Sequence, residues 1–562
     1  MVYLNTLDNG FISDDIPAII RNPLLVHPAR FWRDPSMLSV SLNFLLAGKD
    51  AFVYHLTNVL LHAVNSVLVF FVLRLLFSKI PSFLGALVFA LHPVHTEAVA
   101  WISGRPYLFI SLFFLLNFLV YHAATKQRRL RAGVYLFSLV LFAYLALNSF
   151  GYYLLFPAFI ILVDVSLGRA RRCWKFWLPY VALTCLKLSF VRMPLLYRID
   201  SLAEPTGNLP AWNDPLLTAA HSFFSNLSVV FWPANLSLYH ETARASQAAL
   251  AIEVALFIAL VAFMPLLFRK AKPLFAGLVL FILFLLPTFS PLAICCLVAE
   301  RYLYLPSLLF SICFAFAYER YALRTALSAR IFLFFFLAAV VALASRTIVR
   351  NNDWQDEKSF WRATFKASPE NPRVLARMGD LYRQEGRIED AVASFKKALA
   401  ITPYDALIYN NLGVTYAQAG KHAEAAAAYQ KATELNPGLA EAYFNLGNLY
   451  MASGRPHDAV RAYKQSIETN PYLAEAYVNM GAVYANEGNY QEAIQSYRKA
   501  LEIFPGHAVA HANLSVAYYE TGEYSLAQEH SRQAQSSGYR IDPGFANRLA
   551  AALDGSSDQH IK

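Results

Sequence analysis

Long apolar stretches separated by short polar links fill the chain up to about residue 350. Ten of these stretches approach the ~20 residues that an α-helix needs to cross a bilayer. We expect membrane-spanning helices at 54–77, 82–101, 106–123, 132–148, 150–167, 174–191, 248–268, 273–290, 303–320 and 329–345. The pattern predicts an all-α protein in which residues 1–350 form a polytopic membrane domain of about 10–11 helices.

The links between the apolar stretches alternate in charge, which predicts their sides of the membrane. Every second link is short and basic, and the positive-inside rule places such links in the cytoplasm. The basic links contain Lys79, Lys126–Arg131, Arg169–Lys175, Arg269–Lys272 and Arg320–Arg330. The extracytoplasmic links are then 1–53, 102–105, 192–247 and 291–302. Ten crossings place the C-terminal half on the same outer side.

Two segments do not fit this alternation. Residues 216–233 are apolar, but a full crossing there would send Arg269–Lys272 outside, so we expect a re-entrant or interfacial segment. The acidic loop near Asp14 begins too soon after Met1 for a helix to precede it. Either the recorded start misses a helix that ends near Tyr3, which we favour, or the loop is translocated as a tail.

The second half of the chain repeats itself with a period of 34 residues. Prolines recur at 369, 403, 437, 471 and 505, and glycines at 379, 413, 447 and 481, where the next position is Ser515. Tyrosines recur from Tyr382 to Tyr518 and a second glycine series runs from Gly386 to Gly522. Small residues let two helices pack closely, glycine turns the hairpin and proline ends the second helix. This spacing matches the tetratricopeptide (TPR) repeat.

The repeat phase predicts the domain boundaries. Five repeats occupy 372–405, 406–439, 440–473, 474–507 and 508–541, together 372–541. Residues 351–371 hold a half-repeat and linker, with the half-repeat at Trp354–Lys366. Residues 542–562 hold a capping helix at Pro543–Leu553 and a tail.

A further register of the repeat carries amides that suit peptide binding. Asparagine stands two residues before the glycine position in four repeats, at Asn411, Asn445, Asn479 and Asn513, while the first repeat has Arg377. Regularly spaced amides facing the concave groove can hydrogen-bond an extended backbone without reading its side chains. The series resembles the asparagine ladder of O-GlcNAc transferase. The alternative is that these amides bond helix to helix within the solenoid.

Composition and charge narrow the possible functions. The chain is 57% hydrophobic with a formal net charge of +10. The charge is +13 over residues 1–365 and −3 over 366–562. Because the cations lie between apolar runs, membrane topology explains them better than nucleic-acid binding does. The five cysteines all lie in or beside the hydrophobic segments, and no ligand spacing suggests a structural metal.

Polar groups that are costly near a bilayer gather at the predicted outer surface. They fall in four places: Phe11–Asp15; His55, Asn58 and His62 on one helical face; His92–Glu97 followed by Gly104-Arg105; and Glu300–Pro306. Taken singly, an acidic pair can be a solvated helix cap, a helix histidine a core residue and Glu300–Arg301 a structural ion pair. Their convergence on one surface favours an active site.

At these positions the sequence resembles the transmembrane and TPR-containing O-mannosyltransferases, which are C-type glycosyltransferases that use lipid-linked sugars. The resemblance rests on the patterns at Phe11–Asp15, His55–His62, His92–Arg105 and Ala299–Ser307, and on the order of a hydrophobic half followed by a TPR half. The chain departs from the family where no helix precedes the acidic loop and where Pro106-Tyr107 replaces an acidic residue.

The resemblance implies a site for a polyprenyl-phosphate sugar. Arg105 and Arg301 would bind the phosphate, because a guanidinium group fits phosphate oxygens, and His92, His95, Glu97 and Glu300 would assist. His55, Asn58 and His62 would support the site. Asp14 or Asp15 would be the general base for the acceptor hydroxyl, and the other would position the acceptor or, less readily, bind a divalent metal. We expect no other cofactor.

The leading prediction is a membrane glycosyltransferase that moves a sugar, mannose in the family, to a protein hydroxyl outside the cytoplasm. Its partners would be the lipid-linked donor, membrane lipids and an acceptor polypeptide in the TPR groove, with no nucleic acid. The alternatives are a non-catalytic membrane-anchored TPR scaffold for envelope proteins and a lipid or polymer transporter. Short loops favour a bacterial inner membrane with periplasmic repeats over an endoplasmic reticulum membrane with luminal repeats.

Overall fold

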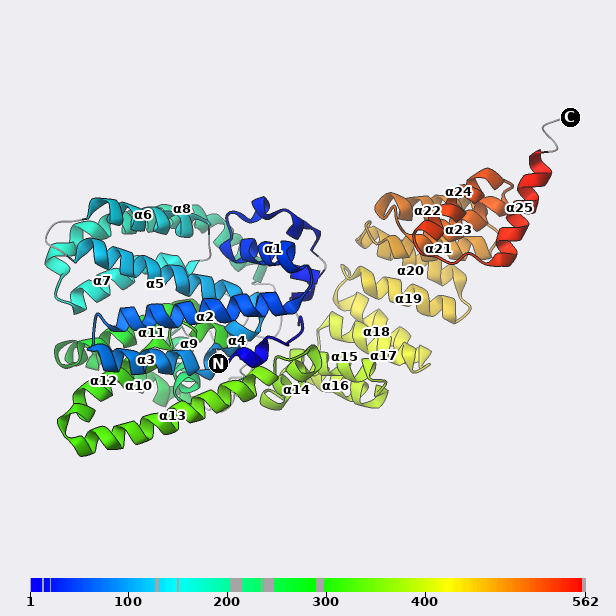
Figure 1. Cartoon of the computed structure of the whole chain (residues 1–562). Coiled ribbons are helices and arrows are strands. Elements are labelled where there is room, and N and C mark those ends of the chain that lie inside the picture. Colours follow the sequence, from blue (N-terminus) through cyan, green and yellow to red (C-terminus); the bar gives the residue numbers. More distant parts are fainter. Residues whose placement is uncertain are drawn as a thin grey trace. The chain divides into compact units, whose positions relative to one another are not determined.

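The computed structural model describes residues 2–12, 15–20, 22–126, 131–148, 151–202, 215–233, 236, 247–289 and 298–557. The described elements are all helical, as predicted. The chain divides into two compact units, Met1–Asn371 and Pro372–Lys562. Figure 1 shows the helices of the first unit and a stack of helical hairpins in the second.

The first unit is built from α1 to α14, linked by short helical turns. Their bounds are α1 Pro35–Ala47, α2 Ala51–Leu73, α3 Lys79–Leu91, α4 Thr96–Ala100, α5 Arg105–Thr125, α6 Ala132–Asn148, α7 Phe156–Ser166, α8 Ala170–Leu202, α9 Pro215–Phe231, α10 Gln247–Lys270, α11 Lys272–Phe289, α12 Leu308–Tyr321, α13 Ala326–Asn352 and α14 Glu357–Ala367. Helix α2 packs on α3 and α5, and α3 packs on α12.

Within the described residues, each of the ten predicted spans overlaps helical structure. Four described helices are long and apolar enough to cross a membrane by themselves: Ala51–Leu73, Ile102–Thr125, Ala248–Lys270 and Ala326–Asn352. The bent pair of α3 with Pro93–Ala100 makes a fifth if it is one span. Other predicted spans correspond to shorter apolar helices, among them 132–146, 153–166 and 272–286. The protein is therefore an integral membrane protein, and the number of ten crossings stays a prediction.

The predicted span 82–101 is not straight. The helix stops at Leu91, His92 takes an extended backbone, and the chain resumes as a 3-10 turn, η5 (Pro93–His95), and then α4. The two parts are bent by 49°. Pro93 explains the break, because proline lacks an N–H and disfavours a helical conformation in the residue before it. The break turns His92, His95 and Glu97 into the interior, where all three are buried.

The segment predicted as re-entrant forms α9, which packs against α10 and α11. Its 17 residues span about 25 Å at 1.5 Å per residue, less than the ~30 Å hydrocarbon core. The carbonyl of Val230, near its C-terminal end, accepts a hydrogen bond from His92 Nε2 at 2.8 Å. The helix thus reaches the same end of the unit as the predicted site.

The N-terminal residues pack against the C-terminal end of α13. The amide of Asn351 donates to the Val2 carbonyl at 2.8 Å and to Asn5 Oδ1 at 2.7 Å. Asn5 Nδ2 donates in turn to the Ile348 carbonyl at 3.2 Å. Nearby, Trp354 is buried with its ring centroid 6.1 Å from that of Trp101.

The second unit consists of five helical hairpins and a final helix. The hairpins pair α15 Pro372–Gln384 with α16 Ile388–Ile401, α17 Ala406–Gln418 with α18 His422–Leu435, α19 Ala440–Ala452 with α20 Pro456–Thr469, α21 Ala474–Asn486 with α22 Tyr490–Ile503, and α23 Ala508–Glu520 with α24 Tyr524–Ser536. Helix α25 (Pro543–Ser557) follows. The glycines that turn the hairpins, Gly386 to Gly522, have φ between 71° and 83° in four of five cases and 68° in Gly454.

Close helix contact in each hairpin depends on the first glycine series. A Cβ added at Gly447 would lie 2.5 Å from the ring of Tyr463, which is 1% exposed. In the fifth repeat Ser515 replaces the glycine, and the residue in register with Tyr463 is Ser531. The smaller partner leaves room for the larger residue, so the break in the glycine series is compensated across the hairpin.

We expect Gly447→Ala to destabilise the repeat array by about 1–3 kcal/mol, because the buried Tyr463 ring cannot move away from the new methyl group. Urea unfolding of a 372–562 fragment measures this. Gly506→Ala is the matched control, since its nearest atom would be 3.6 Å away in Phe504. Equal stability of the two variants would show that the Gly447 contact does not limit packing.

A histidine pair in the last hairpin predicts acid sensitivity. His511 Nε2 donates to the Pro505 carbonyl at 2.9 Å, so its Nδ1 accepts from His530 Nδ1 at 3.0 Å. Burial, and next the neighbouring His511, lower the pKa of His530.

The unfolded chain therefore takes up a proton first as the pH falls through about 6.5, and folding stability should decrease from that pH downward. Thermal unfolding of the 372–562 fragment between about pH 7.5 and 5 tests this. The variant His511→Tyr restores the residue type of Tyr409, Tyr443 and Tyr477, which precede it at the 34-residue period, and should flatten the pH dependence. A slope that persists unchanged in this variant would remove the pair as its cause.

Candidate active site

The four predicted groups of polar residues meet at one end of the helices of the first unit. His55 lies near the start of α2, His92 follows the last residue of α3, α5 begins at Arg105, and Arg350 lies in the last turn of α13. The basic links lie at the other ends of the same helices. This arrangement is the one that the alternation of charged links predicts.

Of the acidic pair, Asp15 is described and Asp14 lies outside the described residues. Asp15 is fully buried. Its Oδ1 accepts hydrogen bonds from the backbone N of Ser103 at 2.8 Å and from the Ser103 hydroxyl at 2.5 Å, and its Oδ2 accepts from the backbone N of Ile12 at 3.3 Å. Asp15 therefore fastens the N-terminal loop to the turn η6 (Ile102–Gly104) that precedes α5.

Arg105 is the centre of a buried hydrogen-bond network. Its Nε donates to Asn58 Oδ1 at 2.7 Å and its Nη2 to the Tyr54 carbonyl at 2.9 Å. Its Nη1 donates to Ser39 Oγ at 3.0 Å and to Asn43 Oδ1 at 2.7 Å. The side chain is fully buried. A guanidinium group so occupied joins α1, α2 and α5, and the phosphate contact predicted for Arg105 does not fit this geometry.

The remaining residues of the α2 face are also buried. Asn58 Nδ2 donates to the carbonyls of Val99 at 3.1 Å and Trp101 at 3.2 Å, which ties α2 to the turn before α5. His55 is 1% exposed and lies beside the backbone of Asn9 and Gly10. His62 Nε2 is 3.2 Å from the Ala90 carbonyl and its Nδ1 is 2.6 Å from the Tyr304 hydroxyl. These residues are buried rather than exposed at a surface, and their supporting role stays a prediction.

His92 and His95 are held in the interior by specific hydrogen bonds. The backbone N of Val94 donates to His92 Nδ1 at 3.2 Å, so His92 Nε2 carries the proton that it donates to Val230. His95 Nε2 is 2.7 Å from the Ser307 hydroxyl, and its ring lies 4.6 Å from that of Tyr304. Both histidines orient the backbone and aromatic groups under the site.

Two carboxylate–arginine pairs connect the broken helix to the turn η8 (Glu300–Leu303). Glu97 accepts from the backbone N of Arg301 at 2.9 Å and forms an ion pair with the Arg301 guanidinium. Glu300 forms an ion pair with Arg350 at 2.7 Å. Complete burial raises the pKa of the Glu300 carboxyl, and the Arg350 guanidinium offsets part of that rise. The pairs place Arg301 and fix η8 to the end of α13.

Arg301 differs from Arg105 and Arg350 in its exposure. Its side chain is 11% exposed, against 1% for Arg350 and full burial for Arg105. It lies at the edge of a small pocket, and its guanidinium carbon is 5.0 Å from the centre of the Tyr302 ring. The other lining residues are Tyr107, Ile110, Ser111, Phe284, Tyr302, Tyr304, Leu305 and Pro306.

Sequence reasoning missed several residues of this network, among them Ser103, Asn43, Arg350 and Tyr304. Ser103, Asn43 and Arg350 carry no recurrent pattern, and each acts through a partner distant in the chain. Tyr304 lies inside the Glu300–Pro306 segment, but its contacts with His62 and Asn65 could not be inferred from the segment alone. No group of three or more His, Cys, Asp or Glu ligands converges among the described residues. The metal predicted at Asp14 and Asp15 stays a prediction.

In the repeat unit, the predicted amides are half-buried and bond between repeats. Asn411 Nδ2 donates to Asp380 at 3.3 Å, Asn445 to Asn410 at 3.0 Å and Asn479 to Asn448 at 2.8 Å. Asn513 interacts with the Tyr497 hydroxyl. These contacts correspond to the helix-to-helix alternative. In Asn411, Asn445 and Asn479 these contacts use the amide N–H. The amide oxygen of each side chain is an additional hydrogen-bond acceptor.

Comparison with protein families identifies the repeats. TPR repeat families match residues 379–420 and 415–454, 440–473, and 472–536. The second unit is therefore a TPR array.

Curated relatives match both halves of the chain. It is 27% identical over 467 residues to the mouse protein O-mannosyl-transferase TMTC3, covering 72% of this chain and 50% of the relative. It is 26% identical over 528 residues to the fruit fly protein O-mannosyl-transferase Tmtc1, covering 72% and 60%. The chain thus spans about half the length of the curated relatives that it matches over both halves. The predicted similarity to the O-mannosyltransferase family is confirmed.

Solved structures match part of the chain. The crystal structure of MamA is 30% identical, covers 28% of this chain and 93% of its own, and gives a TM-score of 0.27. The crystal structure of YrrB, a TPR protein, is 23% identical, covers 35% and 97%, and gives a TM-score of 0.28.

Proposed function

We propose that this chain is a membrane glycosyltransferase that transfers a sugar from a polyprenyl phosphate to a hydroxyl of a polypeptide. The names of its relatives indicate mannose as the sugar. One observation carries the proposal: the acidic loop, the broken helix and η8 are joined into one network, at whose edge Arg301 lines a pocket. Charged groups buried in a membrane domain are energetically costly and commonly mark a functional site.

The donor phosphate would bind beside Arg301. A cation at the membrane surface suits a phosphate diester, and a guanidinium group can donate two parallel hydrogen bonds to it. Glu97 holds Arg301 in place through both its backbone and its side chain. Tyr107, at the position where the family has an acidic residue, lines the same pocket and adds a hydroxyl rather than a charge.

In the reaction the acceptor oxygen attacks the anomeric carbon, the bond from that carbon to the phosphate oxygen breaks, and the polyprenyl phosphate leaves. The acceptor hydroxyl must lose its proton, and a carboxylate serves as the base. Asp15 is buried and accepts hydrogen bonds from Ser103 and Ile12, which suits a positioning role. We therefore assign the general base to Asp14.

The acceptor polypeptide would bind to the TPR array. The array follows α13 and α14 in the chain, and the last turn of α13 contains Arg350, which is paired with Glu300 of the site. The chain therefore leaves the membrane helices at the site end, which supports an extracytoplasmic location for both. The acceptor oxygens of Asn411, Asn445 and Asn479 would receive backbone N–H groups of an extended segment. The compartment would be the periplasm or, alternatively, the lumen of the endoplasmic reticulum.

Sugar transfer by the purified protein tests this function. Full-length protein in detergent, polyprenyl-phosphate mannose and a library of serine- and threonine-containing peptides should yield peptides that are heavier by one hexose. Arg301→Ala should abolish the product. Absence of transfer from any polyprenyl-phosphate hexose, combined with complementation of a deletion strain by a chimera of the TPR array on an unrelated membrane anchor, would instead identify a scaffold.

A further inference from the structure

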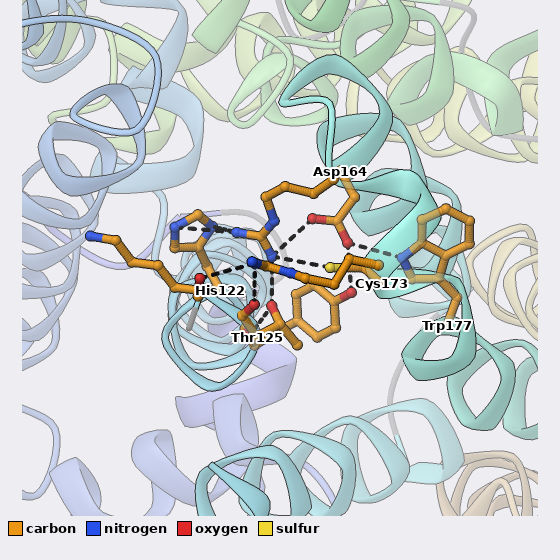
Figure 2. Close-up of polar contacts among 9 residues, drawn as sticks. His122, Thr125, Asp164, Cys173 and Trp177 are labelled. Carbon is orange, nitrogen blue, oxygen red and sulfur yellow. Dashed lines mark hydrogen bonds and ion pairs between the residues drawn. The ribbon is translucent and has the colours of Figure 1, made fainter. Parts of the chain in front are cut away.

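A second buried polar cluster lies at the opposite end of α5 from the candidate site. Figure 2 shows Asp164 of α7 facing residues of α5 and α8. Asp164 Oδ2 accepts from the Tyr121 hydroxyl at 2.7 Å and from Trp177 Nε1 at 2.9 Å, and its Oδ1 pairs with Arg169 at 3.0 Å. Since the cluster residues of α5, from Tyr121 to Thr125, follow Arg105 on the same helix, about 24–30 Å separates them from Arg105 along the helix axis at 1.5 Å per residue.

Two arginines donate hydrogen bonds to acceptors at the C-terminal end of α5. Arg169 donates to Thr125 Oγ1 at 2.6 Å and to His122 Nδ1 at 2.7 Å. Arg172 Nη2 donates to the carbonyls of Thr125 at 2.6 Å and Lys126 at 2.9 Å. Cations at this end also complement the helix dipole. The junction of α5, α7 and α8 is thus fixed by side chains, and the Asp164 charge is neutralised within it (Figure 2).

Exposed cations surround this junction. We call them the α5-end patch: Lys126, Arg131, Arg171, Arg172 and Lys175. The patch is compact, because Arg172 contacts Lys126 and the backbone N of Arg131 bonds to the Ala124 carbonyl at 3.2 Å. Between Glu97 and Asp200 the only acidic residue in the sequence is Asp164, which is buried. The segment that forms the patch therefore supplies no exposed acid of its own to balance these cations.

The patch borders on apolar surface rather than on water alone. Exposed apolar side chains follow it along α6 and α8: Val134, Leu136, Phe137, Val140, Leu178 and Leu186. Trp174 is 48% exposed, and Lys175 Nζ lies 5.6 Å from its ring centre, which is an arrangement typical of the boundary between headgroups and acyl chains. A free anion would explain the cations but not this apolar border.

We propose that the α5-end patch binds the headgroup of an anionic phospholipid, with the acyl chains against α6 and α8. Arg171 and Lys175 are one helical turn apart on α8 and would contact the phosphate from one side, with Lys126 and Arg172 on the other. Such clusters at a membrane surface attract anionic lipids strongly. This proposal is independent of the proposed activity, because it concerns the membrane surface opposite to the site.

Tryptophan quenching by brominated lipids tests the proposal on the full-length protein in neutral detergent. The protein is titrated with phosphatidylglycerol and, separately, phosphatidylcholine, both with brominated acyl chains. The part of the quenching that is lost in the Trp174→Phe variant measures lipid binding at the α5-end patch. We expect saturable quenching by phosphatidylglycerol and at least about tenfold weaker binding in Arg171→Ala/Lys175→Ala. If this variant unfolds at a lower temperature, Arg171→Gln/Lys175→Gln replaces it.

The matched control removes the same charge from another basic link. Arg269→Ala/Lys270→Ala, at the end of α10, should change the binding of phosphatidylglycerol less than about threefold. Equal weakening in both double variants would show general electrostatic attraction and overturn the proposal. Quenching that does not distinguish the two lipids would overturn it as well. Full displacement of the lipid by inorganic phosphate at equal concentration would identify a free-anion site instead.

Discussion

Asp14→Asn should lower the rate of sugar transfer by about two to four orders of magnitude, because the acceptor hydroxyl then has no base to take its proton. The amide has the shape of the carboxylate, so folding and peptide binding should be unchanged. Product formation from polyprenyl-phosphate mannose under single-turnover conditions measures the chemical step. The midpoint of thermal unfolding, measured on the same preparation, reports the fold.

Asp15→Asn is the matched variant, and its expected behaviour differs. The amide would present an N–H group to Ser103 or Ile12, where the carboxylate accepts three hydrogen bonds, so the loop should detach and the unfolding temperature should fall. Ser103→Ala should produce part of the same loss of stability. If Asp15→Asn abolishes transfer without affecting stability, while Asp14→Asn remains active, the assignment of the base is reversed.

The parts of the fold that depend on periodicity could be predicted from the sequence. A 34-residue period in proline, glycine and tyrosine predicts helical hairpins, because each repeat needs the same contacts with its neighbours. The apolar lengths and the alternating basic links predict the membrane helices and the single end at which His55, His92, Arg105 and Glu300 gather. Each of these features depends on residues close together in the sequence, so a short stretch is enough to predict it.

The contacts within the site could not be predicted in the same way. A motif shows that Arg105 and Arg301 are both near the surface, but only the positions of α1 and α2 decide which guanidinium group is enclosed. Asn43 and Ser39 lie in α1, far from Arg105 in sequence, and take its donors. Likewise, the apolar pattern predicts one span over 82–101, whereas Pro93 breaks the helix and Glu97 pairs with Arg301. Both outcomes depend on tertiary packing.

Arg105→Met should destabilise the membrane unit by about 3–5 kcal/mol. The methionine keeps most of the volume but removes the donors that Asn58, Asn43, Ser39 and the Tyr54 carbonyl now share. Those buried acceptors would be left unpaired, and each such loss costs about 1–3 kcal/mol. Thermal unfolding in detergent, or the urea dependence of unfolding, measures the effect.

Arg301→Met provides the contrast for Arg105→Met, because Arg301 is part of the pocket edge rather than of the enclosed network. We expect it to lose donor binding with a smaller loss of stability. The pair Arg105→Met and Asn58→Ala should show a coupling energy in a double-mutant cycle, since Asn58 Oδ1 accepts from Arg105 Nε. If Arg105→Met is stable and fails only to bind the donor, Arg105 contacts the donor phosphate. The distinction between the two arginines, on which the proposed site is built, would then be wrong.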